Sequence, residues 1–347
     1  MLLLLVAGEA AYWRFAAERL RAGYQEWLDG LAAQGWNVAS GSPSISGWPR
    51  AATVSVPGLT LRHAGPAVPG DLEVAAASVT LSVSLLSSDD LGISLTGPTH
   101  IRVADTPDLV LTAKENRIST PLRESGSTTI DVQAKGVRIE PAAGGWQATA
   151  GLLNGRGTFM DEMRVGEVKA GEVKAGSPEP AATFGVSAEA IVLPEVIKWP
   201  LGARISSLSL DGVLNGPLPP ARDITDWAKA WRDGGGSLAI THFTLGWGPL
   251  GLTSSATLAL DDQLQPMGSG NGRVVGYAAT LDQLAAAGVL TKSAATAAKA
   301  VLSLLAGAGG ESDEPSAVDV PLTLQYRTLS MRQVPLVRLP ELDWPAH

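Results

Sequence analysis

The sequence contains no cysteine, which excludes disulfide bonds, thiolate nucleophiles and cysteine-based metal or iron–sulfur sites. Histidine is scarce as well. The four histidines stand at positions 63, 100, 242 and 347, and no two have the His-x-x-x-His spacing of a helical metal site. We therefore predict no metal ligands and no cofactor.

Charged residues are few, at 17% of the chain against roughly 25% in an average soluble protein. The formal net charge is −8 and no Lys/Arg cluster occurs, whereas nucleic-acid-binding proteins carry a concentrated basic patch. Nucleic acid is therefore not expected as a partner. Hydrophobic residues make up 45% of the chain, enough for a packed core. The length of 347 residues suits one large β domain or two smaller ones.

No apolar run is long enough to span a bilayer, which takes about 20 residues in a helix. The first eight residues, Met1–Gly8, are apolar and uncharged, and Glu9 ends the run. Two interpretations stay open: this run is the end of a membrane anchor whose beginning lies upstream, or it is the first turns of a docking helix. Arg14, Arg19 and Arg21 follow the run and no basic residue precedes it. By the positive-inside rule the body would then stay cytoplasmic, so export requires a true start upstream.

An amphipathic helix is predicted to continue from this run. Apolar or small residues recur three or four positions apart, which is the spacing of one helix face: Trp13, Ala16, Leu20, Tyr24, Trp27 and Leu31. Gly35 is a suitable C-terminal stop.

Most of the remaining chain alternates apolar and polar residues with a period of two, the pattern of antiparallel strands with one wet face. The phase changes at Pro57-Gly58 and again between Ala76 and Val79, as a β-bulge or sharp bend requires. Further strands are predicted at Ile130–Ile139, Trp146–Phe159, Phe184–Leu193, Ile205–Leu214, Leu238–Trp247, Leu250–Leu260 and Val318–Met331. The expected fold is mainly β, a curved antiparallel sheet or sandwich, with an N-terminal amphipathic helix and two or three C-terminal helices.

The apolar face of these strands has two interpretations. It is the ordinary core of a sandwich, or it is the apolar side of a curved sheet that holds lipid. The apolar/polar alternation favours neither interpretation, because both require a sheet with one apolar face. The candidate lining residues are Val54, Val56, Leu81, Val83, Val186, Leu238, Ile240, Leu322 and Leu324.

Helices are predicted at Ile224–Arg232, from Thr280 to Ala287 and at Ser293–Leu305, with an exposed acidic loop at Gly307–Ser316. The tandem copies of Gly-Glu-Val-Lys-Ala at 166–175 mark the best internal boundary. The chain is accordingly divided into 1–35 (anchor remnant and helix), 36–178 (N-terminal β half) and 179–347 (C-terminal β half with covering helices).

Motifs that carry chemistry are missing: there is no P-loop, GxSxG elbow or metalloprotease helix. Gly268–Gly272 is rich in glycine and is interpreted as a turn. His242 is in phase with Leu238 and Ile240, which predicts a half-buried, hydrogen-bonded histidine. The carboxylate pairs Asp161/Glu162 and Asp261/Asp262 do not have the spacing of a glycosidase cleft. No catalytic residue is therefore assigned.

Three Trp-Pro pairs each follow a predicted strand, at Trp48-Pro49, Trp199-Pro200 and Trp344-Pro345. Proline cannot donate to a central ladder and the indole is a broad cap, so these pairs are interpreted as plugs at strand ends.

Several segments together resemble the proteobacterial domain-of-unknown-function family 2125. In the N-terminal part they are the block Ala11–Ala17, then Leu20, Gly23, Trp27, Gly35-Trp36, Gly47–Pro49 and the strand Ala52–Leu61. In the C-terminal part they are Gly234–Leu238, Leu245–Pro249, Leu258–Gln265 and Pro335–Trp344. The resemblance implies an inner-membrane anchor, a periplasmic β-rich body and a distant likeness to AsmA-type envelope proteins, which are associated with lipid transport and outer-membrane assembly. It implies no catalytic residues.

Three hypotheses follow. The first is a non-enzymatic envelope protein that binds or shields lipid, attached to the inner membrane and facing the periplasm if the true start lies upstream of Met1. The second is a structural or adaptor module that binds another envelope protein through a sheet edge or the Trp-rich strand ends. The third and weakest is a glycan-acting enzyme.

Overall fold

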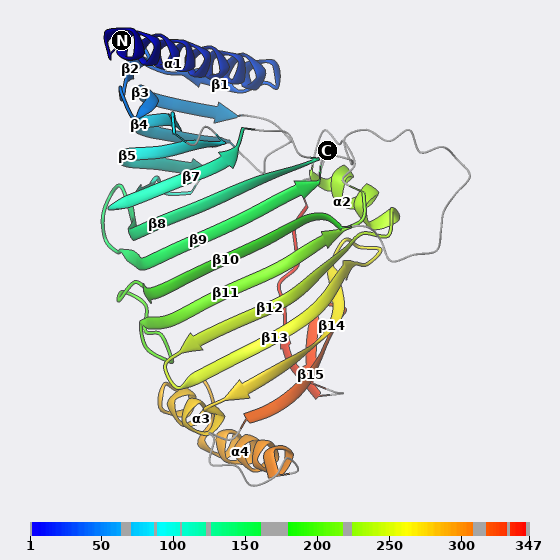
Figure 1. The fold of residues 1–347 in the computed structure, drawn as a ribbon. Coiled ribbons are helices and arrows are strands. Elements are labelled where there is room, and N and C mark those ends of the chain that lie inside the picture. Colours follow the sequence, from blue (N-terminus) through cyan, green and yellow to red (C-terminus); the bar gives the residue numbers. More distant parts are fainter. Residues whose placement is uncertain are drawn as a thin grey trace, which may run out of the picture.

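The computed structural model describes residues 2–63, 71–86, 89–104, 106–122, 126–160, 180–217, 224–307, 317–331 and 334–344. Within these ranges the chain forms one antiparallel sheet and four helices (Figure 1). The expected mainly β class, the curved sheet, the N-terminal helix and the C-terminal helices are all confirmed. The helices are α1 (Leu2–Ala33), α2 (Ile224–Asp233), α3 (Tyr277–Ala286) and α4 (Lys292–Gly307).

The strands follow one another across the sheet. They are β1 (Asn37–Ala39), β2 (Ser44–Ser46), β3 (Ala51–His63), β4 (Leu72–Ser84), β5 (Asp90–Val103), β6 (Leu109–Thr112), β7 (Glu115–Pro121), β8 (Ser127–Pro141), β9 (Ala148–Met160), β10 (Pro180–Val192), β11 (Arg204–Asn215), β12 (Ser237–Trp247), β13 (Leu250–Leu260), β14 (Pro266–Val275), β15 (Ala317–Gln325), β16 (Thr328–Met331) and β17 (Val334–Arg338).

The order of strands in the sheet is nearly the order in the sequence. The short strands β1 and β2 both pair with β3, and β6 and β7 lie end to end between β5 and β8. β9 and β10, on either side of the predicted internal boundary, pair with each other from Ala182/Phe159 to Val192/Thr149. The sheet is therefore continuous between the two β halves. The tandem repeat at 166–175 lies outside the described residues.

A crease crosses part of the sheet where residues with positive φ lie on every second strand, β3, β5, β8 and β10. These residues are Gly58 (62°), Gly97 (83°), Gly136 (58°) and Ala190 (51°). A positive φ suits glycine, because a side chain is strained there. The buried positions of β3 change from Ala52, Val54 and Val56 to Leu59 across Gly58, which confirms the phase change expected from Pro57-Gly58. The crease bends the strands while their apolar side chains stay on one face.

Strands β5, β6 and β7 are missing from the sequence-based assignment, because the crease interrupts their alternation. β5 carries a register shift opposite Ala76/Ser78, beside Gly97-Pro98. Near the start of β7 the side chain of Asn116 takes the place of the backbone ladder to β5. Its amide oxygen accepts from the Leu95 N–H at 2.6 Å, and its amide nitrogen donates to the Leu95 carbonyl at 2.7 Å.

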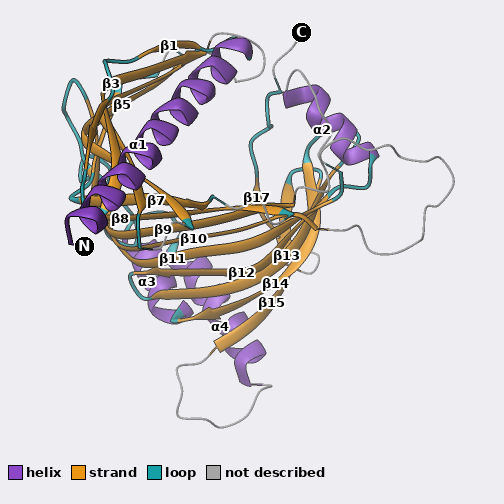
Figure 2. Cartoon of the chain, turned by 45° about the horizontal axis from the view of Figure 1, so that its top comes forward, coloured by secondary structure: helices purple, strands orange, loops and turns teal. Residues whose placement is uncertain are grey.

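Helix α1 packs on β3 and β1 at one end of the sheet, which curves around it in Figure 2. Ala17 and Tyr24 are buried, and Leu20 and Leu28 pack against the same cluster. Trp27 was predicted on this face but is 47% exposed, and Leu28 takes its place because the contact face follows the 3.6-residue turn. Within the described part of the chain, no helix is both long and apolar enough to span a membrane.

The C-terminal helices match their predictions closely. α3 begins at Tyr277 rather than Thr280, because the Thr280 hydroxyl donates to the Gly276 carbonyl at 2.9 Å and so lies within the first turn instead of capping it. α3 and α4 lie at the end of the sheet opposite α1 (Figure 1). The acidic loop predicted at Gly307–Ser316 lies, beyond Gly307, outside the described residues.

Candidate functional site: one apolar face of the sheet

One row of directly paired residues runs across the sheet from β3 to β15, and nearly all its members are apolar or glycine. Residues that pair in an antiparallel ladder point to the same side of the sheet. The row consists of Val54, Leu81, Ile93, Ile118, Val132, Gly155, Val186, Leu210, Phe243, Ser254, Gly272 and Val320. At about 4.8 Å per strand it extends for about 50 Å along the curved sheet. We call the side of the sheet that carries this row the apolar face.

The pairing places all nine predicted lining residues on the apolar face. Their exposure differs strongly along the sheet. Val54 and Val56 are fully buried beneath α1, where Tyr24 contacts them, and Leu81 is 8% exposed. Leu324 is also buried, whereas Val83, Leu238, Ile240 and Leu322 are partly buried. Val186, in the middle of the sheet, is 47% exposed.

The centre of the apolar face carries two more exposed side chains that the sequence analysis did not select. Ile130 on β8 is 37% exposed and Phe159 on β9 is 47% exposed. Among the described elements, the helices pack mainly elsewhere: α1 on β1 and β3, α2 and α3 on β13, and α4 on β15. The sequence does contain a signal for Ile130 and Phe159. Ile130 is two residues from Val132 and Phe159 is four residues from Gly155, and side chains an even number of positions apart in a strand lie on the same face.

The far end of the face is closed like the near end. Val318 is 1% exposed and Val320 is 7% exposed, and they form a cluster with Tyr277 of α3. Leu302 of α4 packs against this cluster. The apolar face is thus a packed core at its two ends. Between them, on β8 to β10, it carries both buried alanines (Ala134, Ala182 and Ala188) and the exposed side chains of Ile130, Phe159 and Val186.

The glycine-rich stretch Gly268–Gly272 is not a turn, as the sequence analysis had it, but the middle of strand β14. Gly268 and Gly270 lie against β13 so closely that an added Cβ would collide with the carbonyl oxygens of Thr257 and Ser255, respectively. Close backbone approach is a known reason for glycine within a strand. The prediction was wrong because the requirement comes from the neighbouring strand.

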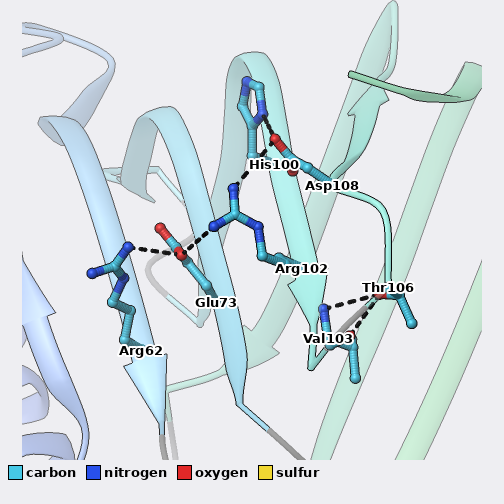
Figure 3. Close-up of polar contacts among 7 residues, drawn as sticks. All are labelled: Arg62, Glu73, His100, Arg102, Val103, Thr106 and Asp108. Atoms are coloured by element: carbon cyan, nitrogen blue, oxygen red, sulfur yellow. Dashed lines mark hydrogen bonds and ion pairs between the residues drawn. The ribbon is translucent and has the colours of Figure 1, made fainter. Parts of the chain in front are cut away.

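The opposite side of the sheet, the polar face, carries charged side chains in matching registers. Figure 3 shows the largest group, which ties β3, β4 and β5 together. Glu73 accepts from Arg62 at 2.9 Å and lies 3.5 Å from Arg102. Arg102 also lies 3.8 Å from Asp108, and Asp108 contacts the His100 Nδ1 at 3.1 Å.

The hydrogen bond from Arg62, helped by its charge, holds the pKa of Glu73 below its ordinary value. Glu73 is therefore a carboxylate at neutral pH, able to accept hydrogen bonds but not to deliver a proton. Other pairs on this face act in the same way. The Asp131 carboxylate raises the pKa of Arg156 on the neighbouring strand, and Lys135 lowers the pKa of Glu115. These exposed pairs link strands, and we assign them no catalytic role.

Two further sequence expectations concern acidic and histidine side chains. Asp261 holds a turn, because its Oδ1 accepts from the backbone N–H groups of Gln263 (2.9 Å) and Gln265 (2.8 Å). His242 is exposed rather than half-buried, since an irregularity in pairing at Thr241 moves it to the polar face opposite Asp211. Asp161 and Glu162 lie outside the described residues. In the ranges that the structure covers, no group of three or more His, Asp or Glu could hold a metal ion.

Tryptophans close several strand ends by donating their indole N–H to backbone carbonyls. Trp199 donates to Pro194 at 2.8 Å, and Trp344 donates to Leu264 at 3.0 Å. These two agree with the predicted plugs. Trp48 does not, because it is 49% exposed.

Comparisons with known proteins identify the chain at the level of a family. The model of the family described as "Uncharacterized protein conserved in bacteria (DUF2125)" matches residues 13–340. No curated protein and no solved structure matches. The matched range includes α1 from Trp13 onward, the whole apolar face and the edge strand β17, and the chain therefore belongs to the DUF2125 family of bacteria.

Proposed function

We propose that this protein is a non-enzymatic envelope protein that binds lipid on the apolar face of its sheet. The proposal is carried by the exposure of Ile130, Phe159 and Val186 at the centre of that face. Contiguous exposed apolar surface is unfavourable in water and marks a binding site in soluble proteins. The ligand it favours is one that brings hydrocarbon and no charge to the contact.

The closed ends of the face argue for a site of limited extent. α1 seals one end with Ala17 and Tyr24, and α4 helps to seal the other with Leu302. A sheet whose apolar face served as an ordinary core would be covered along its whole length. Among the described residues, the exposed apolar side chains at the middle of the face, Ile130, Phe159 and Val186, lie on β8 to β10 beside the buried Ala134, Ala182 and Ala188, and this is where we place the lipid.

We further propose that the protein is held at the inner membrane through its N-terminal segment, with the sheet on the periplasmic side. On α1, Tyr12 is 50% exposed and Phe15 is 65% exposed. Aromatic side chains of this kind favour the interface between bilayer and water. They support a position of α1 next to the membrane, with the sheet beyond it.

The test is to purify the full chain from bacterial membranes and to measure bound phospholipid by mass spectrometry. The matched variants are Val186→Asp, which puts a charge on the apolar face, and Ser187→Asp, which puts the same charge on the polar face one residue away. We expect lipid in the wild type and in Ser187→Asp, and much less in Val186→Asp. A folded wild-type protein without lipid would refute the proposal.

A second candidate function, an adaptor that binds another envelope protein, is favoured by one observation. Trp146 (36% exposed) and Val196 (66% exposed) line a small pocket between the β8–β9 and β10–β11 connections, and Ile197 beside them is 51% exposed. A photo-crosslinking residue in place of Val196 tests this candidate in cells. A reproducible adduct with one envelope protein supports it, and adducts with lipid alone contradict it.

A further inference from the structure

Helix α1 is held to the sheet by few contacts for its length of 32 residues. Only two of its described side chains are buried, Ala17 and Tyr24. From the described part of α1 one side-chain hydrogen bond reaches the sheet, donated by the Trp13 Nε1 to the Ala51 carbonyl at 2.9 Å. The ion pairs found among its described residues join helix residues to each other. The attachment of α1 therefore depends on a short apolar stretch.

This attachment includes a polar group that docking leaves unsatisfied. The Tyr24 hydroxyl is buried in the cluster beneath α1, with Val54 and Val56, and has no hydrogen-bond partner among the described residues. Burial takes away the hydrogen bonds that a hydroxyl makes with water, and here nothing replaces them. Water satisfies the hydroxyl again when α1 lifts, so this group favours the lifted helix.

A hinge lies between α1 and β1. Gly35 has a φ of 89°, a conformation that suits glycine, and no described atom lies within 4 Å of the place where its Cβ would be. Directly after it, Trp36 packs on His63 with 4.8 Å between the ring centroids, and β1 pairs with β3 from Asn37 onward. The chain is thus fixed to the sheet from Trp36 and is free to turn at Gly35, which lets α1 move as one body.

The outer side of α1 is apolar as well. Tyr12 and Phe15 are exposed, and they lie five and two residues from the buried Ala17, roughly half a helical turn away from it. A lifted helix therefore has aromatic side chains to place at a bilayer–water interface.

We infer that α1 is a lid and that the lipid-binding surface of the apolar face continues beneath it. Lifting α1 uncovers Val54, Val56, Val79 and Leu81, and the row of paired residues leads from Val54 to the centre of the face. The inference rests on the proposed function, and it adds how far the lipid-binding surface extends and what controls access to it.

The other end of the face stays closed. There α3 and α4 pack on each other as well as on the sheet, and Lys299 of α4 pairs with Asp282 of α3. Val318 is buried in the cluster with Tyr277 of α3, as Val56 is buried in the cluster with Tyr24 of α1. The two ends therefore supply a matched pair of buried valines and a matched pair of tyrosines.

The first test compares the two valines in lipid-free, full-length protein. The chain has no cysteine, so Val56→Cys and Val318→Cys each give a single thiol, and its rate of reaction with a water-soluble maleimide is measured. Val56→Cys should react about tenfold faster or more, because lifting a helix takes less free energy than unfolding the sheet. Equal rates would overturn the inference, since Val56 would then be reached only by global unfolding.

Second substitutions in the Val56→Cys protein should move this rate in opposite directions. Tyr24→Phe removes the unsatisfied hydroxyl and should slow labelling about fivefold, whereas Trp13→Phe removes the hydrogen bond to Ala51 and should speed it about fivefold. Tyr277→Phe is the matched control and should leave the rate unchanged. If Tyr277→Phe changes the rate as much as Tyr24→Phe does, the lid is wrong.

The last test connects the lid to lipid. Wild type, Tyr24→Phe and Trp13→Phe, each with Val56 in place, are mixed with phosphatidylglycerol vesicles that carry a radiolabelled palmitoyl chain, and the label that the re-isolated protein retains is counted over time. Uptake should be slower in Tyr24→Phe and faster in Trp13→Phe. If all three proteins take up lipid at one rate, the lid is wrong while the proposed function stands. If the wild type takes up none, the proposed function fails and the inference fails with it.

Discussion

The exposure of side chains changes along the row of paired residues, and the same substitution made at two of its positions measures this change. Val54 and Val186 lie in the same row, but Val54 is fully buried beneath α1 and Val186 is 47% exposed. Replacing each by alanine removes the same two methyl groups.

The expected losses of stability differ severalfold. At Val54 the lost transfer free energy is about 1.6 kcal/mol, and the cavity left under α1 brings the total to about 2–3 kcal/mol. At Val186 about half of the side chain is already in water and no closed cavity forms, so the expected loss is about 0.8 kcal/mol or less.

Urea unfolding followed by tryptophan fluorescence compares the two variants with the wild type in lipid-free protein. A midpoint that shifts much more for Val54→Ala than for Val186→Ala supports the open centre of the face. Equal shifts would refute it, because they would mean that Val186 is covered in solution.

Three further predictions concern other parts of the fold. Gly212→Val should lower the free energy of unfolding by about 2 kcal/mol or more, because the new side chain collides with the ring of Phe184, and thermal unfolding measures the loss. Tyr24→Phe should raise stability by about 1 kcal/mol in urea, since the buried Tyr24 hydroxyl has no hydrogen-bond partner; a lower midpoint would show that the hydroxyl is satisfied in solution. Glu73→Gln should be less stable than the wild type at neutral pH. The pKa of Glu73 is lowered on folding, so its stabilising effect is present above the unfolded pKa of about 4.3 and is lost as the pH falls through the lower folded value. Acid titrations of the two proteins should therefore converge below that pH, and a gap that persists at lower pH would exclude the Arg62 pair as its cause.

The sequence predicted the strands wherever apolar and polar residues alternate without interruption. β12 and β13 were predicted at Leu238–Trp247 and Leu250–Leu260, which is nearly or fully the range that the structure has. Such strands can be predicted from the sequence, because the position of each residue in the alternating pattern decides which face of the sheet its side chain is on. The change of phase at Pro57-Gly58 was readable too, since both residues punctuate a strand locally.

Features that depend on neighbouring strands were not predictable. The crease depends on where Gly58, Gly97, Gly136 and Ala190 fall on β3, β5, β8 and β10, and only the pairing through the strands between them aligns these positions. The same is true of β14, whose glycines are explained by close contact with β13.

The candidate lining residues show the same limit. Alternation placed all nine of them on one face, but it carried no information on what covers that face. Val54 and Val186 are both valines at apolar positions of alternating strands, but the structure buries Val54 and exposes Val186. The difference arises because α1, a segment more than a hundred residues from β10, packs over one end of the sheet and leaves the centre open.

If the proposed function is correct, the middle of the apolar face is open to water in the free protein and covered by lipid in the loaded one. The chain has no cysteine, so Val186→Cys gives a single thiol at the centre of that face. The rate of its reaction with a water-soluble maleimide is measured before and after incubation with phosphatidylglycerol vesicles, and Ser187→Cys on the polar face is the control. We expect fast labelling of Val186→Cys in lipid-free protein and strong protection by lipid, with no protection of Ser187→Cys. Slow labelling without lipid, or a rate that lipid leaves unchanged, would contradict it.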